Sequence, residues 1–343
     1  MKVIVGMSGG VDSSVAAYLL KKEGWNVIGV LFNTVEKPDE VSKCCNFNAV
    51  IAAGKMLHIP IKVVDVYEEF NREIIQDFIN QYKNGFTPNP CVLCNEKIKF
   101  GSGLKKVEGL FKGSFFATGH YAIIEKNDRL HLKAGMDKGK DQSYMLWRLK
   151  QWQLKKTIFP LGAFTKRDVY KIAAKIKLPV LSSESQDVCF IPGKVKAFLE
   201  RYLPQREGKI ISTKGKILGR HNGAYFYTVG QRSGLHISHL VPLYVVRIDT
   251  EKNVVFVGER EECFFRTAEL IDVNFIEKWD FTEKELTGKP RYHAKSSPCI
   301  LKKDGDKVIV QFDVPQFAVA PGQSLVLYDD DYVFGGGIIK RAY

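Results

Sequence analysis

The sequence predicts an α/β fold in which an N-terminal parallel-sheet domain is followed by two small, mainly β domains. Three observations support this prediction. Apolar runs alternate with helix-patterned segments through the first part of the chain, and a glycine-rich turn directly follows the first run. From about Gly208 onward, the pattern changes to short alternating runs joined by turn signals. The first pattern is typical of a parallel sheet covered by helices, and the last of antiparallel sheets.

The N-terminal domain is built from strands and helices in alternation. Its predicted strands are Val3–Met7, Asn26–Phe32, Ile61–Val66 and Phe115–Tyr121. Its predicted helices are Val11–Glu23, Ala49–Leu57, Tyr67–Lys83, Gln142–Leu149, Lys166–Ile176 and Lys194–Tyr202. Sheets of this kind bind ligands at the carboxyl ends of their strands, so we expect the functional site there.

The second half of the chain reads as antiparallel hairpins. The predicted strands are Ala224–Val229, Leu243–Asp249 with Val254–Gly258, Cys299–Lys303 with Lys307–Phe312, and Ser324–Tyr328 with Tyr332–Ile339. A break near Thr267–Ile271 divides this half in two. We therefore predict three domains, at residues 1–205, 206–270 and 271–343, of which the last is a β-barrel.

The composition favours a polyanionic partner. The 343 residues carry 51 basic and 38 acidic side chains, a formal net charge of +13. Nucleic acid is the commonest partner for such an excess, and a solvated basic surface is the alternative. The first apolar run is too short for a signal peptide, and no stretch reaches the length of a membrane span. A cytoplasmic protein is expected, in which the seven cysteines stay reduced.

The most informative stretch is the turn Ser8–Ser14, with the sequence SGGVDSS. It lies between a predicted strand and a predicted helix. Glycines let a ligand approach the backbone, and free amide groups and the helix dipole favour an anion. The turn has no lysine, so it is not an ordinary P-loop, and it is not G-x-G-x-x-G. A tight turn without a ligand would need only the glycines, whereas this one also holds Asp12 and three serines. We therefore predict a phosphate site.

A second feature is the cysteine pair Cys91 and Cys94, which follows a proline-rich loop. A helix that starts at Asn95 would place Cys94 at its N-terminus, where the dipole lowers a thiol pKa. The pair is also half of a zinc or iron–sulfur site, although no second C-x-x-C and no H-x₃₋₅-H occurs in the chain. Reactive thiol, metal ligand and inert packing all remain open.

The remaining cysteines differ in their surroundings. Cys189 ends a polar run, and together with a reactive Cys94 it would suit a sulfur relay, in which one thiol carries a persulfide and the other resolves it. Cys263 and Cys299 lie in apolar stretches and are expected to pack in the core. Cys44 and Cys45 lie in a loop-like stretch, where they are incidental, a redox pair or metal ligands.

Several motifs together carry a family resemblance. The turn Ser8–Ser14 resembles the pyrophosphate loop of the ATP pyrophosphatases (PP-loop family), which split ATP between its α and β phosphates and adenylate a substrate. Eight motifs in register resemble those of the tRNA-specific 2-thiouridylases (the MnmA/TrmU family), and they span essentially the whole chain. They are Ser8–Ser14, Asn89–Asn95, Thr118–Tyr121, Lys140–Tyr144, Ser185–Phe190, Tyr227–Arg232, Pro321–Gln323 and Gly335–Ile339.

The resemblance implies roles for matching residues. Those for ATP are Gly6, Met7, Ser8, Gly9, Gly10, Val11, Asp12 and Ser13, with Phe32 and Gly119; Asp12 would also help to position Mg²⁺. Cys94 matches the family's nucleophile and Cys189 its persulfide carrier. The expected tRNA contacts are Asn89, Pro90, Cys91, His120, Lys140, Asp141, Gln142, Arg291, Tyr292 and Gln323. Many members carry Asp where this chain has Cys91, which leaves the base-contact role of that position and the metal alternative open.

The implied reaction is the 2-thiolation of a tRNA wobble uridine. The uracil oxygen would be adenylated with release of pyrophosphate, and a persulfide sulfur would then replace it with release of AMP. Expected partners are the tRNAs for Lys, Glu and Gln and a sulfur donor, either a cysteine desulfurase or a relay protein. We expect a monomer without a tightly bound metal, an iron–sulfur cluster being the alternative. An amidotransferase-type synthetase would need a glutaminase domain, which is not evident, and an RNA-binding or metal-carrier protein would not need the Ser8–Ser14 loop.

Overall fold

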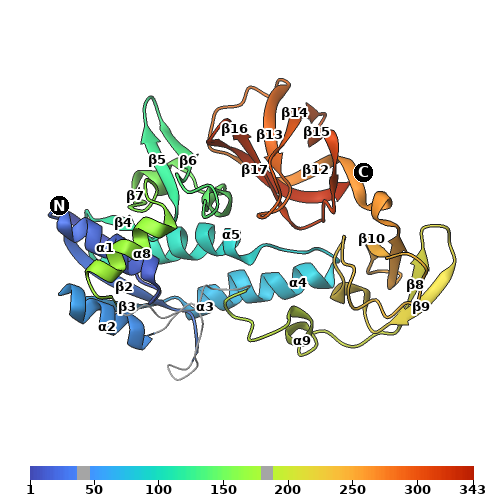
Figure 1. The fold of residues 1–343 in the computed structure, drawn as a ribbon, viewed down its shortest axis with the longest axis horizontal. Helices are drawn as coiled ribbons and strands as arrows, with labels where there is room; N and C mark the ends of the chain where they lie inside the picture. Colours follow the sequence, from blue (N-terminus) through green and yellow to red (C-terminus); the bar gives the residue numbers. More distant parts are fainter. Residues whose placement is uncertain (37–46, 179–187) are drawn as a thin grey trace. The chain divides into compact units, whose positions relative to one another are not determined.

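The computed structural model describes residues 1–36, 47–178 and 188–343, which divide into two compact units (Figure 1). The first unit comprises residues 1–75, 90–190 and 331–333. The second comprises residues 76–89, 191–330 and 334–343. The chain therefore leaves the first unit after residue 75 and returns to it at residue 90. The predicted three-domain boundaries stay predictions.

The first unit is built on a five-stranded sheet with the order β3-β2-β1-β4-β7. All four strand pairs are parallel, which confirms the predicted sheet class. Every residue of β1 between Val3 and Val5 is buried, as expected for a central strand covered on both faces. The strands are β1 (Lys2–Gly6), β2 (Asn26–Asn33), β3 (Ile61–Asp65), β4 (Phe115–Ala117) and β7 (Thr157–Ile158).

Helices cover both faces of this sheet. Helices α1 (Val11–Lys22) and α2 (Phe47–Leu57) pack on the face that carries Val3 and Val5, and α8 (Lys166–Lys175) packs on α1. On the other face, Phe100 of the segment η2 meets Phe116 of β4 edge-on, with 5.6 Å between ring centroids. Apolar side chains of the helical segments therefore pack on both faces of the sheet.

Two long helical segments are each part α-helix and part π-helix. The first runs through α3 (Tyr67–Phe70), η1 (Asn71–Gln76) and α4 (Asp77–Lys83), which confirms the predicted helix. The second runs through α5 (Pro90–Cys94), η2 (Asn95–Ser102) and α6 (Gly103–Leu110). The prediction of a helix that starts at Asn95 was wrong. A proline suits the first position of a helix because its missing N–H would have no partner there, and the helix starts at Pro90.

Three other predicted elements differ. The predicted helix Gln142–Leu149 is only the 3₁₀ turn η3 (Ser143–Leu146), followed by α7 (Gln151–Lys155). The predicted strand Ala224–Val229 contains the 3₁₀ turn η4 (Ala224–Phe226), in which Tyr225 and Phe226 stack edge-on at 4.7 Å. The predicted strand Phe115–Tyr121 ends early at Ala117, and a hairpin of β5 (Ala122–Lys126) and β6 (Leu130–Ala134) follows.

The second unit contains a four-stranded sheet and a barrel. The sheet has the order β10-β11-β8-β9 and follows the short helix α9 (Val195–Leu199). The hairpin of β10 and β11 is the one predicted from the sequence. The strands are β8 (Gly208–Ser212), β9 (Ile217–His221), β10 (Tyr244–Asp249) and β11 (Val254–Gly258); the 3₁₀ turn η5 (Arg260–Cys263) comes next.

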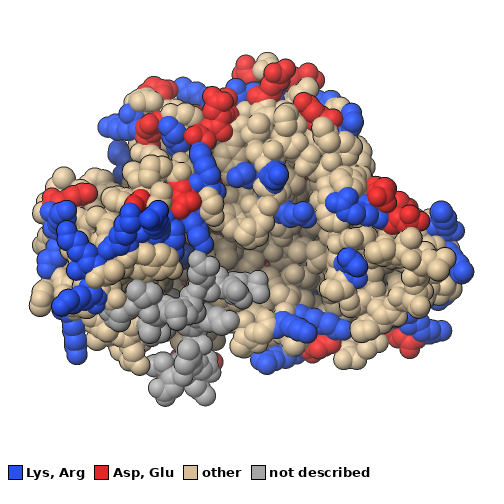
Figure 2. Space-filling model, in the orientation of Figure 1, with Lys and Arg blue, Asp and Glu red and all other residues tan. Residues whose placement is uncertain are grey.

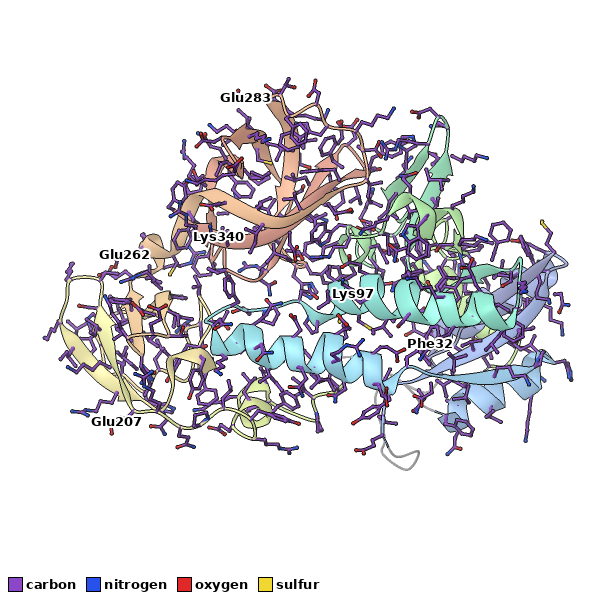
Figure 3. The ribbon with its side chains drawn as sticks, turned by 180° about the vertical axis from the view of Figure 1, so that it is seen from behind. Phe32, Lys97, Glu207, Glu262, Glu283 and Lys340 are labelled. Atoms are coloured by element: carbon purple, nitrogen blue, oxygen red, sulfur yellow. The ribbon has the colours of Figure 1, made fainter. Side chains whose placement is uncertain are left out.

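The barrel closes through pairing of β12 with β17, in the order β12-β15-β14-β13-β16-β17. At this seam the buried Glu269 accepts hydrogen bonds from Lys340 and Arg341 at 2.9 and 2.7 Å, and Lys340 is labelled in Figure 3. The hydrogen bond from Lys340 is the main reason why the pKa of Glu269 lies below its usual value. The strands are β12 (Phe264–Phe275), β13 (Lys284–Lys289), β14 (Ser297–Asp304), β15 (Lys307–Phe317), β16 (Ser324–Asp329) and β17 (Tyr332–Ala342), which confirms the predicted β-barrel.

Candidate functional site

The loop Ser8–Ser14, which we call the phosphate loop, connects the carboxyl end of β1 to α1. Gly9 has a φ of +82°, a conformation that other residues rarely adopt. The Ser13 hydroxyl accepts a hydrogen bond from the Ser8 amide at 3.2 Å and donates to the Gly10 carbonyl at 3.2 Å. Ser14 donates to the same carbonyl at 3.0 Å. The serines therefore hold the loop closed around its own backbone.

Glycines border the first turn of α1. Gly10 is the N-cap residue and brings no side chain to the first amides of the helix. Gly119, which follows β4, lies so close that a Cβ there would come within 2.7 Å of the Ser13 amide nitrogen. Amides at a helix N-terminus bind anions through hydrogen bonds and the helix dipole. The predicted phosphate site is thus lined by main-chain atoms of two neighbouring elements.

Asp12 lies in this turn and is held by two residues that the sequence reasoning did not select. The ammonium group of Lys166 donates to both Asp12 oxygens, at 2.7 and 2.8 Å. The hydroxyl of Tyr121 donates to Asp12 Oδ1 at 2.8 Å. Burial, and next the Asp12 charge, raise the pKa of Tyr121, so this hydroxyl keeps its proton. Lys166 is the first residue of α8, where the dipole disfavours a cation. That unfavourable position is the signal in the sequence that could have selected it.

The motif Lys140–Tyr144 is hydrogen-bonded to Tyr121 through Gln142. The Gln142 side-chain oxygen accepts a hydrogen bond from the main-chain amide of Tyr121 at 3.2 Å. The main-chain amide of Gln142 donates to the Tyr121 carbonyl at 2.9 Å. Asp141 is buried and accepts from the amides of Gly135 and Ser143 at 2.9 and 3.0 Å. These bonds fix the loop that carries Tyr121. The predicted tRNA contacts of Lys140, Asp141 and Gln142 stay predictions.

Phe32 lies at the end of β2, where Figure 3 labels it. Its ring packs at 5.9 Å from that of Phe116. A Cβ at Gly103 would come within 2.8 Å of the Phe32 ring, so only glycine fits there. Phe32 thus occupies the carboxyl end of the sheet beside α6, and its contact with a nucleotide stays a prediction.

His120 lies between aromatic rings. Its Nδ1 and the Thr118 hydroxyl are 2.7 Å apart, and the rings of Phe100 and Phe159 lie at 6.0 and 5.9 Å. Desolvation, and next the charge of Lys99, lower the pKa of His120 well below its usual value, so the imidazole is neutral at neutral pH. A neutral ring can accept or donate a hydrogen bond but offers no charge to a phosphate.

Cys94 ends α5 and lies one turn inside the helical segment, whereas Cys91 is the second residue of that helix and is exposed. The dipole argument made for Cys94 therefore applies more directly to Cys91, because the effect fades within the first turn. Cys189 is half-buried. Its neighbour Phe190 packs edge-on at 5.8 Å from Phe70 of α3, which lies beside η2. Both predicted thiols therefore belong to the first unit.

Two of the other cysteines, Cys44 and Cys45, lie outside the described residues. The same is true of the polar run Ser182–Asp187. Cys263 and Cys299 are buried, as predicted, and burial raises their pKa to about 11 and about 12. Within residues 1–36, 47–178 and 188–343, no three His, Cys, Asp or Glu side chains gather as a metal cluster would. Because Cys44 and Cys45 are not included, the metal alternative for Cys91 is not tested.

In the second unit, the loop before Pro90 is bonded to the barrel. The Thr87 amide donates to the Pro321 carbonyl, and the Gln323 side chain donates to the Thr87 carbonyl, both at 2.8 Å. The side chain of Gln323, a predicted tRNA contact, thus holds the loop that leads to Asn89. Arg291 lies over the Phe317 ring at 5.8 Å, and Tyr292 stacks on its neighbour His293 at 4.7 Å.

Basic side chains gather near the phosphate loop. On the face shown in Figure 2, lysines and arginines cluster over the part of the first unit that carries α1 and α8. Arg167, Lys171 and Lys175 of α8 are all exposed and recur every four residues, so they share one face of the helix. Such a surface suits a polyanion. Among the described helices, none is long and apolar enough to cross a membrane.

Comparison with known proteins places this geometry in a family. Residues 1–193 match the model of the tRNA methyl transferase HUP domain, 196–259 that of the tRNA methyl transferase PRC-barrel domain, and 266–339 that of the aminomethyltransferase beta-barrel domain. The chain is 47% identical to tRNA-specific 2-thiouridylase MnmA 1 of Caldanaerobacter subterraneus subsp. tengcongensis, with 99% of this chain and 98% of that protein covered. It is 45% identical to MnmA 2 of Thermoanaerobacter sp. (99% and 98% covered) and 42% identical to MnmA of Clostridium acetobutylicum (99% of each covered). Because the domain models and these relatives match along nearly the whole chain, the chain belongs to the family of tRNA-specific 2-thiouridylases.

Proposed function

We propose that this chain 2-thiolates the wobble uridine of tRNA in two chemical steps, adenylation by ATP and transfer of sulfur from a cysteine persulfide. The observation that carries the proposal is the phosphate loop, with Asp12 held between Lys166 and Tyr121, in the same unit as Cys94 and Cys189. Full-length membership of the family of tRNA-specific 2-thiouridylases supports the tRNA substrate. ATP use fits the HUP domain.

In the first step, the uracil oxygen at carbon 2 attacks the α-phosphorus of ATP, and pyrophosphate leaves. The loop residues Gly6–Ser13 bind the phosphates through main-chain amides, with Phe32 and Gly119 beside the nucleotide. Lys166, which is 15% exposed in its side chain, supplies a positive charge at the mouth of the loop. Its role is to neutralise charge that develops on the phosphates, and a preorganised group of this kind gives a large part of the rate enhancement.

The residues present fit a magnesium ion. Asp12 offers a carboxylate whose Oδ2 accepts one hydrogen bond, from Lys166, and so keeps a lone pair for a metal ion. Mg²⁺ prefers oxygen ligands and is usually held by one or two carboxylates together with phosphates of the substrate. Bound there, it would supply charge neutralisation to ATP.

In the second step, the terminal sulfur of a Cys189 persulfide attacks carbon 2 of the adenylated uracil, and AMP leaves with the oxygen. The Cys94 thiolate then attacks the sulfur atom of Cys189. The electron pair of the broken S–S bond stays with the sulfur on carbon 2, which gives 2-thiouridine and a Cys94–Cys189 disulfide. A dithiol reductant restores both thiols, and a sulfur donor protein, a cysteine desulfurase or a relay protein, reloads Cys189.

The tRNA substrates proposed are those for Lys, Glu and Gln, bound to a monomer. The wobble base must leave the anticodon stack to reach the loop, as base-modifying enzymes require. We assign tRNA contacts to the residues inferred above, namely Asn89, Pro90, Cys91, His120, Lys140, Asp141, Gln142, Arg291, Tyr292 and Gln323. Basic side chains on α8 are suited to phosphates of the RNA.

The test measures two products from one reaction mixture that holds ATP, tRNA and a persulfide source. Pyrophosphate release should rise when tRNA is added, and mass spectrometry of digested tRNA should detect 2-thiouridine. Cys94→Ser and Cys189→Ser should each abolish 2-thiouridine and keep tRNA-dependent pyrophosphate release. Cys299→Ala, which changes a buried barrel cysteine, is the matched control and should keep both products. Full thiolation by either serine variant would refute the sulfur relay. Pyrophosphate release that does not change when tRNA is added would refute tRNA as the substrate.

A further inference from the structure

The segment η2, which begins directly after Cys94, is a π-helical segment that is interrupted by a kink at Gly101. Its C-cap residue Gly103 donates its amide to the Ile98 carbonyl, five residues earlier, instead of the four of an α-helix. Within it, Gly101 has non-helical dihedral angles, φ −103° and ψ −106°. A Cβ at Gly101 would come within 2.7 Å of the Glu96 carbonyl oxygen. The chain therefore requires glycine at this position, and other segments must stabilise the wide turn.

Gln153 of α7 provides that support. Its side-chain amide donates to the Phe100 carbonyl at 2.8 Å and to the Glu96 carbonyl at 3.0 Å. Its side-chain oxygen accepts from the Lys150 amide at 2.9 Å. Gln153 is 2% exposed, so its side chain is shielded from water, and its bond to the Phe100 carbonyl is buried. The side-chain amide of Gln153 thus bonds two carbonyls of η2 that are four residues apart.

The same stretch of chain holds η2 at two further points. The buried Asn95, which follows Cys94 directly, donates its side-chain amide to the Met145 carbonyl at 2.9 Å. Glu96 forms an ion pair with Arg148 at 2.5 Å, and both side chains are mostly buried. Residues 145–153 therefore bind the segment from Asn95 to Phe100 through hydrogen bonds and an ion pair. Lys97, labelled in Figure 3, lies on the same segment and is exposed.

We propose that Gln153 is a positioning residue that fixes the π-helical register of η2 and thereby the direction in which Cys94 presents its thiol. In an α-helix, successive side chains are rotated by about 100° about the helix axis. A shift of register by one residue after Cys94 would therefore rotate the Cys94 side chain by about 100° relative to η2. Sulfur transfer requires the attacking and receiving atoms to be aligned, and a misplacement of about 1 Å can cost about a hundredfold in rate.

The proposal rests on the proposed role of Cys94 as the thiol that releases sulfur. Adenylation at the phosphate loop does not use Gln153, because the groups that hold Asp12 belong to Tyr121 and Lys166. Loss of Gln153 should therefore separate the two steps. Thiolation should fall while tRNA-dependent pyrophosphate release continues, a pattern that a general loss of stability would not give.

The experiment compares Gln153→Met with Gln151→Met, the matched control on the same helix. Gln151 also bonds two backbone groups, the amide and the carbonyl of Leu130, at 3.2 and 2.8 Å, but these lie in β6 and not in η2. The alkylation rate of Cys94 by iodoacetamide, followed by mass spectrometry after reduction, is the readout that does not depend on catalysis. If Gln153→Met fails to fold, Gln153→Glu keeps the acceptor for Lys150 and removes the donors.

We expect Gln153→Met to lower 2-thiouridine formation by about a hundredfold, to change the Cys94 alkylation rate, and to leave pyrophosphate release within about twofold. Gln151→Met should leave all three near wild type. Equal loss in both variants, or an unchanged alkylation rate and thiolation in Gln153→Met, would overturn the proposal. Failure of the proposed function would show differently, as wild-type protein that forms no 2-thiouridine while the alkylation rates of the two variants still differ.

Discussion

Lys166 donates from one ammonium group to both carboxylate oxygens of Asp12, at 2.7 and 2.8 Å, across 154 residues of sequence. Because this cation faces the phosphate loop, Lys166→Met should lower tRNA-dependent pyrophosphate release by about 10²–10³-fold, as the loss of one preorganised charged donor does. The substitution keeps the length of the side chain and removes its charge. Release of labelled pyrophosphate under single-turnover conditions is the measurement.

Lys171→Met is the control for Lys166→Met. Lys171 lies on the same helix, its side chain is 64% exposed, and its carboxylate partner Asp168 is 3.9 Å away. This variant should keep the rate of pyrophosphate release within about twofold at saturating tRNA, since exposed ion pairs contribute little. Equal losses in both variants would mean that Lys166 acts only through the general charge of α8.

Gln323 and Thr87 give a second prediction. Gln323→Leu removes the side-chain donor to the Thr87 carbonyl, so the free energy of unfolding should fall by about 1 kcal/mol and the KM for tRNA should rise. Thermal unfolding and steady-state thiolation at varied tRNA concentration measure the two effects. Gln311→Leu, on β15, removes a bond from Lys302 at 3.1 Å and serves as control. A Gln323→Leu protein with unchanged melting temperature would argue against the loop anchor.

His120 predicts a pH dependence of stability. Its pKa is lowered in the folded protein, mainly by desolvation, whereas an unfolded histidine titrates near 6.5. Below that pH the unfolded chain binds more protons than the folded one, so stability falls as the pH is lowered from about 7.5 to 5.5. Burial lowers the pKa of His221 too, which adds a change of the same sign.

His120→Asn should therefore reduce, and not abolish, the loss of stability on acidification. Urea unfolding at pH 7.5 and 5.5 measures it, above the range in which ordinary carboxylates titrate. His293→Asn is the control, because His293 is exposed. A steeper pH dependence in His120→Asn than in wild type would contradict the burial argument.

Cys263 and Cys299 should resist alkylation in the folded protein. Their pKa values are raised to about 11 and about 12 by burial, so almost no thiolate forms at pH 8. Mass spectrometry after iodoacetamide treatment should find both unmodified without denaturant and both modified in urea. Rapid modification of either under native conditions would show that the barrel or its neighbouring turn opens readily.

Local sequence patterns predicted the sheet, the phosphate loop and the hairpins β10–β11, β14–β15 and β16–β17, because each of these is specified by short-range information. A buried strand such as Val3–Met7 and a turn such as Ser8–Ser14 can be read without knowledge of distant residues. The helix starts at Pro90, a residue type that suits the first helical position, whereas the prediction placed the start at Asn95, after the cysteine motif. Patterns shorter than one helical turn leave such boundaries open.

The residues that the sequence did not reveal act over long separations. Lys166 approaches Asp12, and Gln153 approaches Phe100, only because the sheet brings their helices together. A lysine or glutamine on a helix is ordinarily a solvated residue, and only the unfavourable position of Lys166 at the start of α8 distinguishes it in the sequence. The π-helical turn of η2 is likewise stabilised by another segment, so its own sequence shows little more than the glycines that permit it.

The interleaving of the two units has a consequence for synthesis on the ribosome. Thr87 and its partner Gln323 are 236 residues apart. At about 5–20 residues per second, roughly 10–50 s pass between the translation of one and that of the other. During that time the stretch just before the Cys94 helix has been made, and its partners in the barrel have not. A nascent chain can therefore fold its N-terminal sheet early, but it acquires an anchored Thr87 loop only after Gln323 has been translated.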